Sequence, residues 1–294
     1  MKVLILGLAK SGTTALAYKI HESMPDGAEL EFEPGKTKGA EDLQLHNRIT
    51  ASNRPVVTKN LIYPDQQTRW QEIWANVAKY DRAIWIVRDP RDILISNFFY
   101  HWYQGYQVDK QAFELALKRT QQKEQSPSSM AFIDLVAGTM TKDRDQLQAW
   151  QQSWYDILNG AAETIQQRMH ILKYEDFVDG RVDGLSEYLG ISIEGETEVP
   201  DEHKRVIRTR GYDNWRRWFT NEDVEFFTPL ISSFLQRMGY DHEDWKLIPC
   251  DTLPSAEGSE YMQDMFKRGR GTARSSKSWL RRFARRVKAK LQSL

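Results

Sequence analysis

The chain has 294 residues, of which 40% are hydrophobic and 28% are charged, and it contains 10 Trp, 12 Tyr and 12 Phe. This composition excludes a mainly disordered chain, and the length fits one large α/β domain or two small ones. A single cysteine, Cys250, excludes an intrachain disulfide framework and a Cys-rich zinc site. No segment reaches the ~18 to 20 consecutive apolar residues that a membrane span needs.

The charges are balanced overall but unevenly distributed along the chain. There are 41 basic and 41 acidic residues, yet from Lys267 to the C-terminus there are 11 Lys or Arg and no Asp or Glu. The part before Lys267 therefore has 30 basic against 41 acidic residues. Such asymmetry indicates an acidic globule with a basic arm that touches an anionic surface, a nucleic acid or the globule itself.

The first residues resemble the start of a secretory signal, because Lys2 precedes an apolar run from Val3 to Ala9. The run is only seven residues long, and polar residues from Lys10 to Thr14 interrupt it. We therefore predict a buried strand that enters a glycine-containing turn and then a helix. We expect a cytoplasmic protein.

Short apolar runs alternate with longer helical patterns along the first hundred residues. Strands are predicted at residues 2–6, 28–32, 55–59 and 82–87, and helices at 13–23, 40–50, 65–79 and 91–104. This alternation predicts an α/β fold with a P-loop-like parallel sheet flanked by helices. The pattern of residues 111–168 predicts a helical insertion of two or three helices, with a break at Ser126-Pro127-Ser128. A further strand at 169–172 leads into a helix at 174–189.

The turn after the first strand has the composition of a phosphate-binding loop. Ligands of open parallel sheets bind beyond the carboxyl ends of the strands, where glycines and a helix N-terminus present backbone amides to an anion. Gly7 and Gly12 have the spacing of a nucleotide-triphosphate loop, but Thr13 stands where that loop needs lysine. The alternative is a plain turn with a surface lysine. The candidate ligand-binding residues are Lys10, Ser11, Gly12, Thr13 and Thr14.

The fourth predicted strand ends in an arginine, Arg88. A Walker-type site would place an acidic residue there to bind magnesium, whereas an arginine fork binds phosphate oxygens at two points. Ser96, about two helical turns later, can add a hydroxyl to the same anion. The alternative is a surface ion pair of Arg88 with Asp89 or Asp92.

A third basic segment contains Arg208, Arg210 and Gly211, and Trp215 and Phe219-Thr220 follow it. Two arginines beside a glycine make a flexible loop suited to closing over an anion. The alternative is a solvated basic loop whose aromatic neighbours pack into the core.

Together these segments resemble the sulfotransferases that use 3'-phosphoadenosine 5'-phosphosulfate, over residues 1 to about 240. The family's 5'-phosphosulfate loop, Lys-Ser-Gly-Thr-Thr, falls on Lys10 to Thr14, and its 3'-phosphate pair falls on Arg88 and Ser96. Its late Arg-x-Gly loop resembles Arg210-Gly211. The family's Tyr-Glu-Asp, whose tyrosine helps to seat adenine, resembles the segment that begins at Tyr174. The resemblance implies that these residues bind the sulfuryl donor.

The chain departs from the cytosolic phenol and steroid sulfotransferases at three places. Their loop is followed by a tryptophan that stacks on adenine, whereas Ala15 follows here. Their Lys-Thr-His, with its catalytic histidine, is replaced by Lys59-Asn60-Leu61. The late loop is one residue shorter between Gly211 and Trp215, so either Arg208 or Arg210 meets the phosphate.

Glu33, within Phe32-Glu33-Pro34, resembles the Glu-Pro turn of glycan sulfotransferases. This likeness implies a soluble, bacterial-type member closer to the glycan branch, with an acceptor hydroxyl on a sugar or glycolipid. Glu33 is then the candidate general base, and a solvated carboxylate or helix cap is the alternative. The reserve candidates for the base are Glu31, His46 and His101.

Sulfuryl transfer resembles phosphoryl transfer, in which positioning and charge stabilisation supply most of the catalysis. Lys10 is the candidate stabiliser of the leaving phosphate oxygen. Lys59, expected at the end of the third strand, either reaches the same group or is a strand-end charge. No metal is expected, because the six histidines lack zinc-like spacing with cysteine or carboxylate. The aromatic helix from Phe98 to Tyr103 either contacts the acceptor or belongs to the core.

Residues 1–266 are predicted to form the sulfotransferase domain, and residues 267–294 a basic hinge and an amphipathic C-terminal helix. The apolar residues of this tail fall on one face of a helix. They are Trp279, Leu280, Phe283, Val287 and Leu291. The pattern is typical of a helix at an anionic membrane surface, peripheral at its inner face. Its alternatives are docking onto the acidic body, a partner helix, or nucleic-acid contact, which we do not expect.

Two other functions stay open from the sequence. A P-loop-like nucleotide kinase would need magnesium and the lysine that is absent after Gly12. A non-catalytic anion- or nucleic-acid-binding module would depend on the basic tail.

Overall fold

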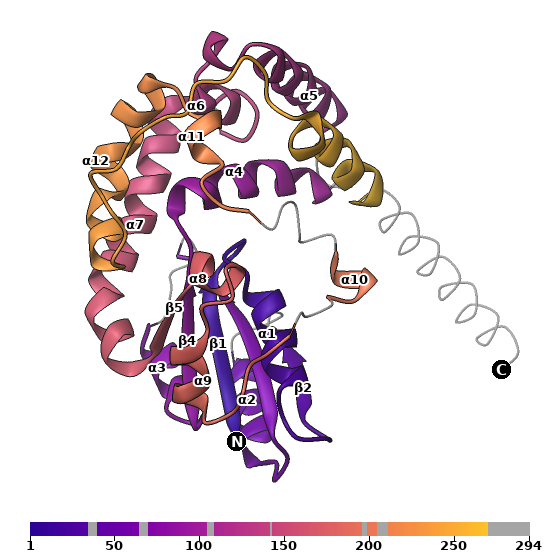
Figure 1. Ribbon diagram of the computed structural model, residues 1–294, viewed down its shortest axis with the longest axis vertical. Coiled ribbons are helices and arrows are strands. Elements are labelled where there is room, and N and C mark those ends of the chain that lie inside the picture. The colour runs from indigo at the N-terminus through magenta and orange to yellow at the C-terminus, as the bar shows by residue number, and fades with distance from the viewer. Residues whose placement is uncertain are drawn as a thin grey trace, which may run out of the picture.

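The computed structural model describes residues 1–34, 40–64, 70–104, 109–141, 143–195, 199–204 and 211–269. Arg208, Arg210 and the amphipathic tail after residue 269 lie outside the described residues. The fold is α/β, with a parallel sheet and a large group of helices beyond the carboxyl ends of its strands (Figure 1). The predicted fold class is therefore confirmed.

The sheet has five parallel strands in the order β2-β3-β1-β4-β5. They are β1 (Lys2–Leu8), β2 (Glu29–Phe32), β3 (Val56–Ile62), β4 (Arg82–Val87) and β5 (His170–Lys173). From β1 the chain passes to β2 and back to β3 on one side of the sheet, and it then crosses over β1 to β4 and β5 on the other side. Ligands of open α/β sheets bind at such a switch point, which places the first turn and Arg88 side by side.

Helices flank the sheet in the predicted order. Those before the insertion are α1 (Thr13–Glu22), α2 (Ala40–Ala51), α3 (Trp70–Val77) and α4 (Pro90–His101), which continues as the 3-10 turn η1 (Trp102–Gln104). The insertion is helical, as predicted, and comprises α5 (Lys110–Gln125), α6 (Phe132–Val136) and α7 (Arg144–Arg168). The predicted break forms the 3-10 turn η2 (Pro127–Ser129).

The prediction of a single helix at residues 174–189 is wrong. The structure has two helices there, α8 (Tyr174–Val178) and α9 (Asp183–Leu189). Between them Gly180 has a φ of 75°, a left-handed conformation that ends an α-helix. The later helices are α10 (Asp201–Lys204), α11 (Trp215–Trp218) and α12 (Asn221–Arg237), and residues 259–269 are also helical after η3 (Ser255–Glu257).

Two hydrophobic cores cover the two faces of the sheet. Val3 and Ile5 of β1 belong to the core that includes residues of α1 and α9. Leu4 and Leu6 belong to the core that extends through α4, α7 and α12. Successive strand residues point to opposite faces, which explains this division. Figure 1 shows α4 across the carboxyl ends of the strands, with α6, α7 and α12 packed on its other side.

No helix in the described part of the chain is both long enough and apolar enough to cross a membrane.

Candidate active site

The turn between β1 and α1 has a tightly fixed backbone. The Ser11 hydroxyl donates to the main-chain oxygen of Leu8 at 2.7 Å, and the Ser11 N–H donates to the same oxygen at 3.2 Å. Lys10 and Gly12 both have left-handed backbones, with φ of 72° and 90°. A Cβ at Gly12 would lie 2.6 Å from the ring of Tyr174. This position therefore needs glycine for both its conformation and its space.

The N-terminus of α1 has the features of an anion site. Its N-cap is Gly12, so no side chain caps the first turn, which contains no acidic residue. Uncapped N–H groups and the helix dipole favour a bound anion. By contrast, the Asp89 carboxylate caps α4 and accepts from the Arg91 N–H at 2.8 Å. The turn after β1 is thus better suited to an anion than the turn after β4.

Arg88 connects the candidate donor-binding residues. It is 5% exposed, and its guanidinium donates to the main-chain oxygens of Lys10 at 3.0 Å and Gly211 at 3.2 Å. It also donates to the Ser96 hydroxyl at 3.4 Å and lies 4.3 Å from the centre of the Tyr174 ring. The structure therefore brings together residues from four separate segments of the sequence.

One N–H donor of the Arg88 guanidinium is unpaired. The Nε atom is buried and has no hydrogen-bond partner among the described residues. A buried unpaired donor of this kind costs about 1 to 3 kcal/mol, and more on a charged group. An anionic group at this end of the sheet would satisfy it, so the residues present fit a phosphate-bearing ligand.

The predicted alternative, a surface ion pair of Arg88 with Asp89 or Asp92, does not form in the structure. Arg88 is buried, and Asp89 binds Arg91 instead, with 2.7 Å between the guanidinium and the carboxylate. Asp92 contributes to the electrostatic environment of Arg88 but accepts its own hydrogen bonds from main-chain N–H groups.

Glu33 and Lys59 form an ion pair on the other side of β1. The Glu33 Oε1 and Lys59 Nζ atoms are 2.5 Å apart, and the side chains are 20% and 5% exposed. Glu33 has a φ of 47°, and its N–H donates to the main-chain oxygen of Lys59 at 2.6 Å. Because β3 continues to Ile62, Lys59 lies within the strand, and the prediction that it ends the strand is wrong. The ion-pair partner of Lys59 is thus the candidate base, Glu33.

The aromatic helix has two kinds of residue. Phe98, Phe99 and Trp102 are at most 1% exposed and belong to the core. Tyr100 is half-buried, and the Lys10 ammonium lies 4.1 Å from the centre of its ring, a cation–π contact. Tyr100 in turn stacks on Tyr103, with 5.6 Å between ring centres. Tyr100 therefore contacts the phosphate loop, and Tyr103 stacks against Tyr100.

The reserve base His46 is occupied elsewhere. Its Nδ1 is 2.8 Å from the Tyr80 hydroxyl, and its Nε2 is 3.1 Å from the Asn60 side chain. Burial, with a smaller effect of Lys79, lowers the pKa of His46 to about 4. Burial also lowers the pKa of His101, whose ring lies edge-on to Trp102. The other reserve carboxylate, Glu31, lies on β2 before the Glu33 turn.

A contact that sequence patterns could not reveal lies beside Glu33. The His203 ring of α10 stacks on Phe32, with 5.0 Å between ring centres, and its Nδ1 is 2.8 Å from the Tyr18 hydroxyl. Tyr18 and His203 are 185 positions apart, so no local spacing predicts their contact. These rings form one wall next to the Glu33–Lys59 pair.

Among the residues that the structure describes, no three His, Cys, Asp or Glu side chains come together as a candidate metal site.

Residues 1–216 match the sulfotransferase domain family, so the chain belongs to this family. The expected class of enzyme is therefore confirmed, and the match favours it over a nucleotide kinase or a non-catalytic binding module. Among solved structures, the chain is similar to the mouse sulfotransferase SULT7A1 complexed with PAP. That similarity has 18% identity and a TM-score of 0.46, and it covers 78% of this chain and 84% of that chain. No curated protein matches the chain.

Proposed function

We propose that this sulfotransferase moves a sulfuryl group from 3'-phosphoadenosine 5'-phosphosulfate to an acceptor hydroxyl. The contact of the buried Arg88 fork with the main chain of Lys10 and Gly211 carries the proposal. It places one arginine between the loop after β1 and the loop before α11. Such a fork can bind one phosphate through two oxygens, and the uncapped start of α1 can bind a second one.

The proposed donor contacts follow from the position of each segment. The 5'-phosphosulfate binds the loop residues Lys10 to Thr14 and the uncapped start of α1. The 3'-phosphate binds Arg88 and Ser96, and Tyr174 contacts the adenine. Gly211 closes the site together with Arg208 and Arg210, which lie outside the described residues.

In the proposed reaction, an S–O bond to the acceptor forms while the S–O bond to the 5'-phosphate breaks. Glu33 takes the proton of the acceptor hydroxyl, and Lys59 holds its carboxylate in place through an ion pair of 2.5 Å. Lys10 stabilises the negative charge that develops on the leaving phosphate oxygen. Lys59 has one of two roles: it either holds Glu33 in place or contacts the leaving group.

The proposed acceptor is a sugar or glycolipid hydroxyl, as in the glycan branch of the family. Two features support it. The candidate base is a glutamate, and the stacked Tyr100 and Tyr103 rings beside Lys10 offer apolar faces on which a sugar ring can lie.

We further propose that residues 1–266 form the catalytic domain and that the basic tail attaches it to the inner face of a membrane. The support is the run of 11 Lys or Arg from Lys267 without an acidic residue. Sedimentation with phosphatidylserine vesicles tests this proposal. The full chain should bind at low salt and a chain ending at residue 269 should not, and equal binding of both would contradict it.

Transfer of radiolabelled sulfate from the donor to mixed acceptors tests the function. We expect label on a carbohydrate or glycolipid acceptor without added ATP. Activity that needs ATP and magnesium would instead indicate the kinase. No turnover together with salt-sensitive nucleic-acid binding would indicate the binding module.

A further inference from the structure

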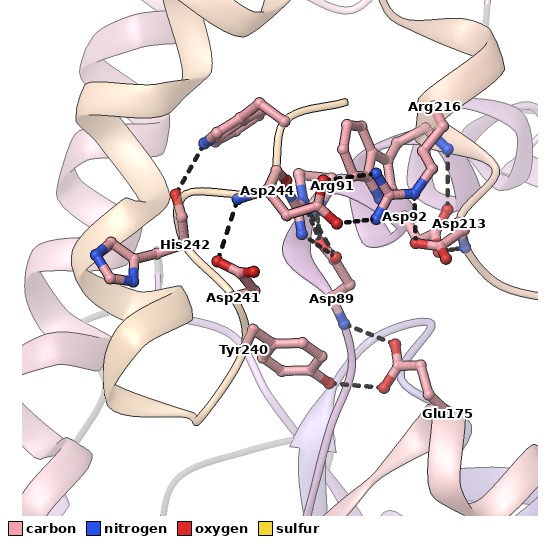
Figure 2. A network of polar contacts seen from close by, with 12 residues as sticks. Asp89, Arg91, Asp92, Glu175, Asp213, Arg216, Tyr240, Asp241, His242 and Asp244 are labelled. Atoms are coloured by element: carbon pink, nitrogen blue, oxygen red, sulfur yellow. Dashed lines mark hydrogen bonds and ion pairs between the residues drawn. The ribbon is translucent and has the colours of Figure 1, made fainter. Parts of the chain in front are cut away.

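Asp92 is a fully buried carboxylate in the first turn of α4. One oxygen accepts from the main-chain N–H group of Asp213 at 2.6 Å (Figure 2). The other accepts from the main-chain N–H group of Trp215 at 3.2 Å. Asp213 has a φ of 60°, so this stretch has an unusual backbone that the two bonds help to fix. Asp92 thus binds the loop that begins at Gly211.

Arg88 attracts the Asp92 carboxylate electrostatically, whereas Arg91, the next basic neighbour in the sequence, has other partners. Asp89 is paired with Arg91, whose guanidinium lies 4.0 Å from the centre of the Trp215 ring and 4.8 Å from that of Trp245. Arg91 also donates to the main-chain oxygen of Asp244. Its donors are therefore directed at Asp89 and at residue 244.

The same loop has a second anchor at its other end. Arg88 donates to the main-chain oxygen of Gly211, two residues before the first N–H that Asp92 accepts. A basic side chain from the end of β4 and an acidic one from α4 therefore bind complementary main-chain groups of residues 211–215. The position of Gly211 relative to Arg88 depends on both.

We propose that Asp92 is a positioning residue for the donor site, which holds residues 211–215 against α4 so that Arg88 and Gly211 stay in binding geometry. This inference rests on the proposed function, because it assigns Arg88 to the donor nucleotide. In Asp92→Asn one carboxylate oxygen becomes an NH2 group, so one of the two buried N–H groups loses its acceptor and the loop separates from Arg88.

Asp92→Asn and the matched control Asp223→Asn test the proposal. Asp223 is equally buried and also accepts main-chain N–H bonds, from Phe132 at 2.8 Å, Ile133 at 2.7 Å and Thr220 at 2.7 Å, but it joins α6 to α12. Binding of 3'-phosphoadenosine 5'-phosphate is measured by calorimetry, beside the thermal midpoint of each variant. Both variants should melt earlier, because each loses a charged acceptor.

Only Asp92→Asn should weaken nucleotide binding, by about 10-fold or more, as expected for bonds to a charged group. In turnover, its KM for the donor should rise more than its KM for the acceptor. Nucleotide binding equal to that of the unchanged protein, with only an earlier melt, would overturn the inference and leave the proposed function intact. If the unchanged protein does not bind the nucleotide, that result contradicts both the proposed function and the inference that rests on it.

If Asp92→Asn does not fold, nucleotide binding by Asp92→Glu tests the inference instead. It keeps the charge but moves the carboxylate by one methylene, so donor binding should again weaken. Unchanged binding in this variant would overturn the inference.

Discussion

The guanidinium of Arg88 donates to the main-chain oxygen of Lys10 at 3.0 Å, across 78 positions of sequence. This bond joins the turn after β1 to the end of β4 at the point where the strand order reverses. The same side chain contacts Ser96 and Gly211. A change at Arg88 should therefore affect the phosphate loop and the late loop together.

Replacement of Arg88 by lysine should weaken the binding of 3'-phosphoadenosine 5'-phosphate by about 10- to 100-fold, because a lysine lacks the planar fork. Calorimetric titration measures this loss. Arg82→Ala is the control, since Arg82 lies at the other end of β4, is exposed, and donates to the main-chain oxygen of Tyr188. An equal loss in both variants would show that the effect is not specific to the site.

Gly12→Ala should abolish nucleotide binding or unfold the loop, and Gly27→Ala serves as its control. Both glycines have a positive φ, of 90° and 85°, so both alanines carry a backbone cost of about 1 kcal/mol. Only at Gly12 would the new Cβ meet the Tyr174 ring, whereas nothing lies within 4 Å at Gly27. Thermal melts and titrations of both variants separate the two costs. Similar results at the two positions would contradict the tight packing of the loop against Tyr174.

Glu33→Gln should leave nucleotide binding unchanged and lower kcat by about 10²- to 10⁴-fold, the range of general-base catalysis. The control is Glu29→Gln on β2, the strand that precedes Glu33, because Glu29 pairs with Arg54 at the surface. That variant should keep its turnover, since exposed ion pairs contribute little. Full turnover in Glu33→Gln would show that Glu33 is not the general base.

Stability should fall as the pH drops from about 6.5 to about 4, partly through His46. The pKa of His46 is lowered to about 4 by burial, so in this window the unfolded chain binds the proton that the folded chain excludes. Protonation therefore favours unfolding, by no more than about 3 kcal/mol for this residue. Urea unfolding of the protein and of His46→Gln over this range measures the effect. Parallel curves for the two proteins would contradict it.

The sequence predicted the parts of the site that local spacing encodes. A glycine turn between a strand and a helix, and an arginine eight residues before a serine, are patterns within one segment, and the fold places them together as expected. The topology follows because strands alternate with helices, and parallel pairing then sets the shared carboxyl edge.

Contacts between distant segments could not be predicted in this way. Asp92 was visible only as an acidic neighbour of Arg88, because nothing near it in sequence indicates that it binds the N–H groups of residues 213 and 215. The position of Lys59 was misjudged for a related reason. The strand was expected to end at Lys59, whereas pairing with β1 continues it to Ile62.

The central claim is that Arg88 recognises a phosphate which distinguishes the donor from other adenosine nucleotides. The most direct measurement compares 3'-phosphoadenosine 5'-phosphate with adenosine 5'-phosphate, each titrated into the unchanged protein and into Arg88→Ala. We predict that loss of the 3'-phosphate weakens binding strongly in the unchanged protein and much less in the variant, because the two groups interact. Equal weakening in both proteins, or equal affinity of the unchanged protein for both nucleotides, would contradict the claim.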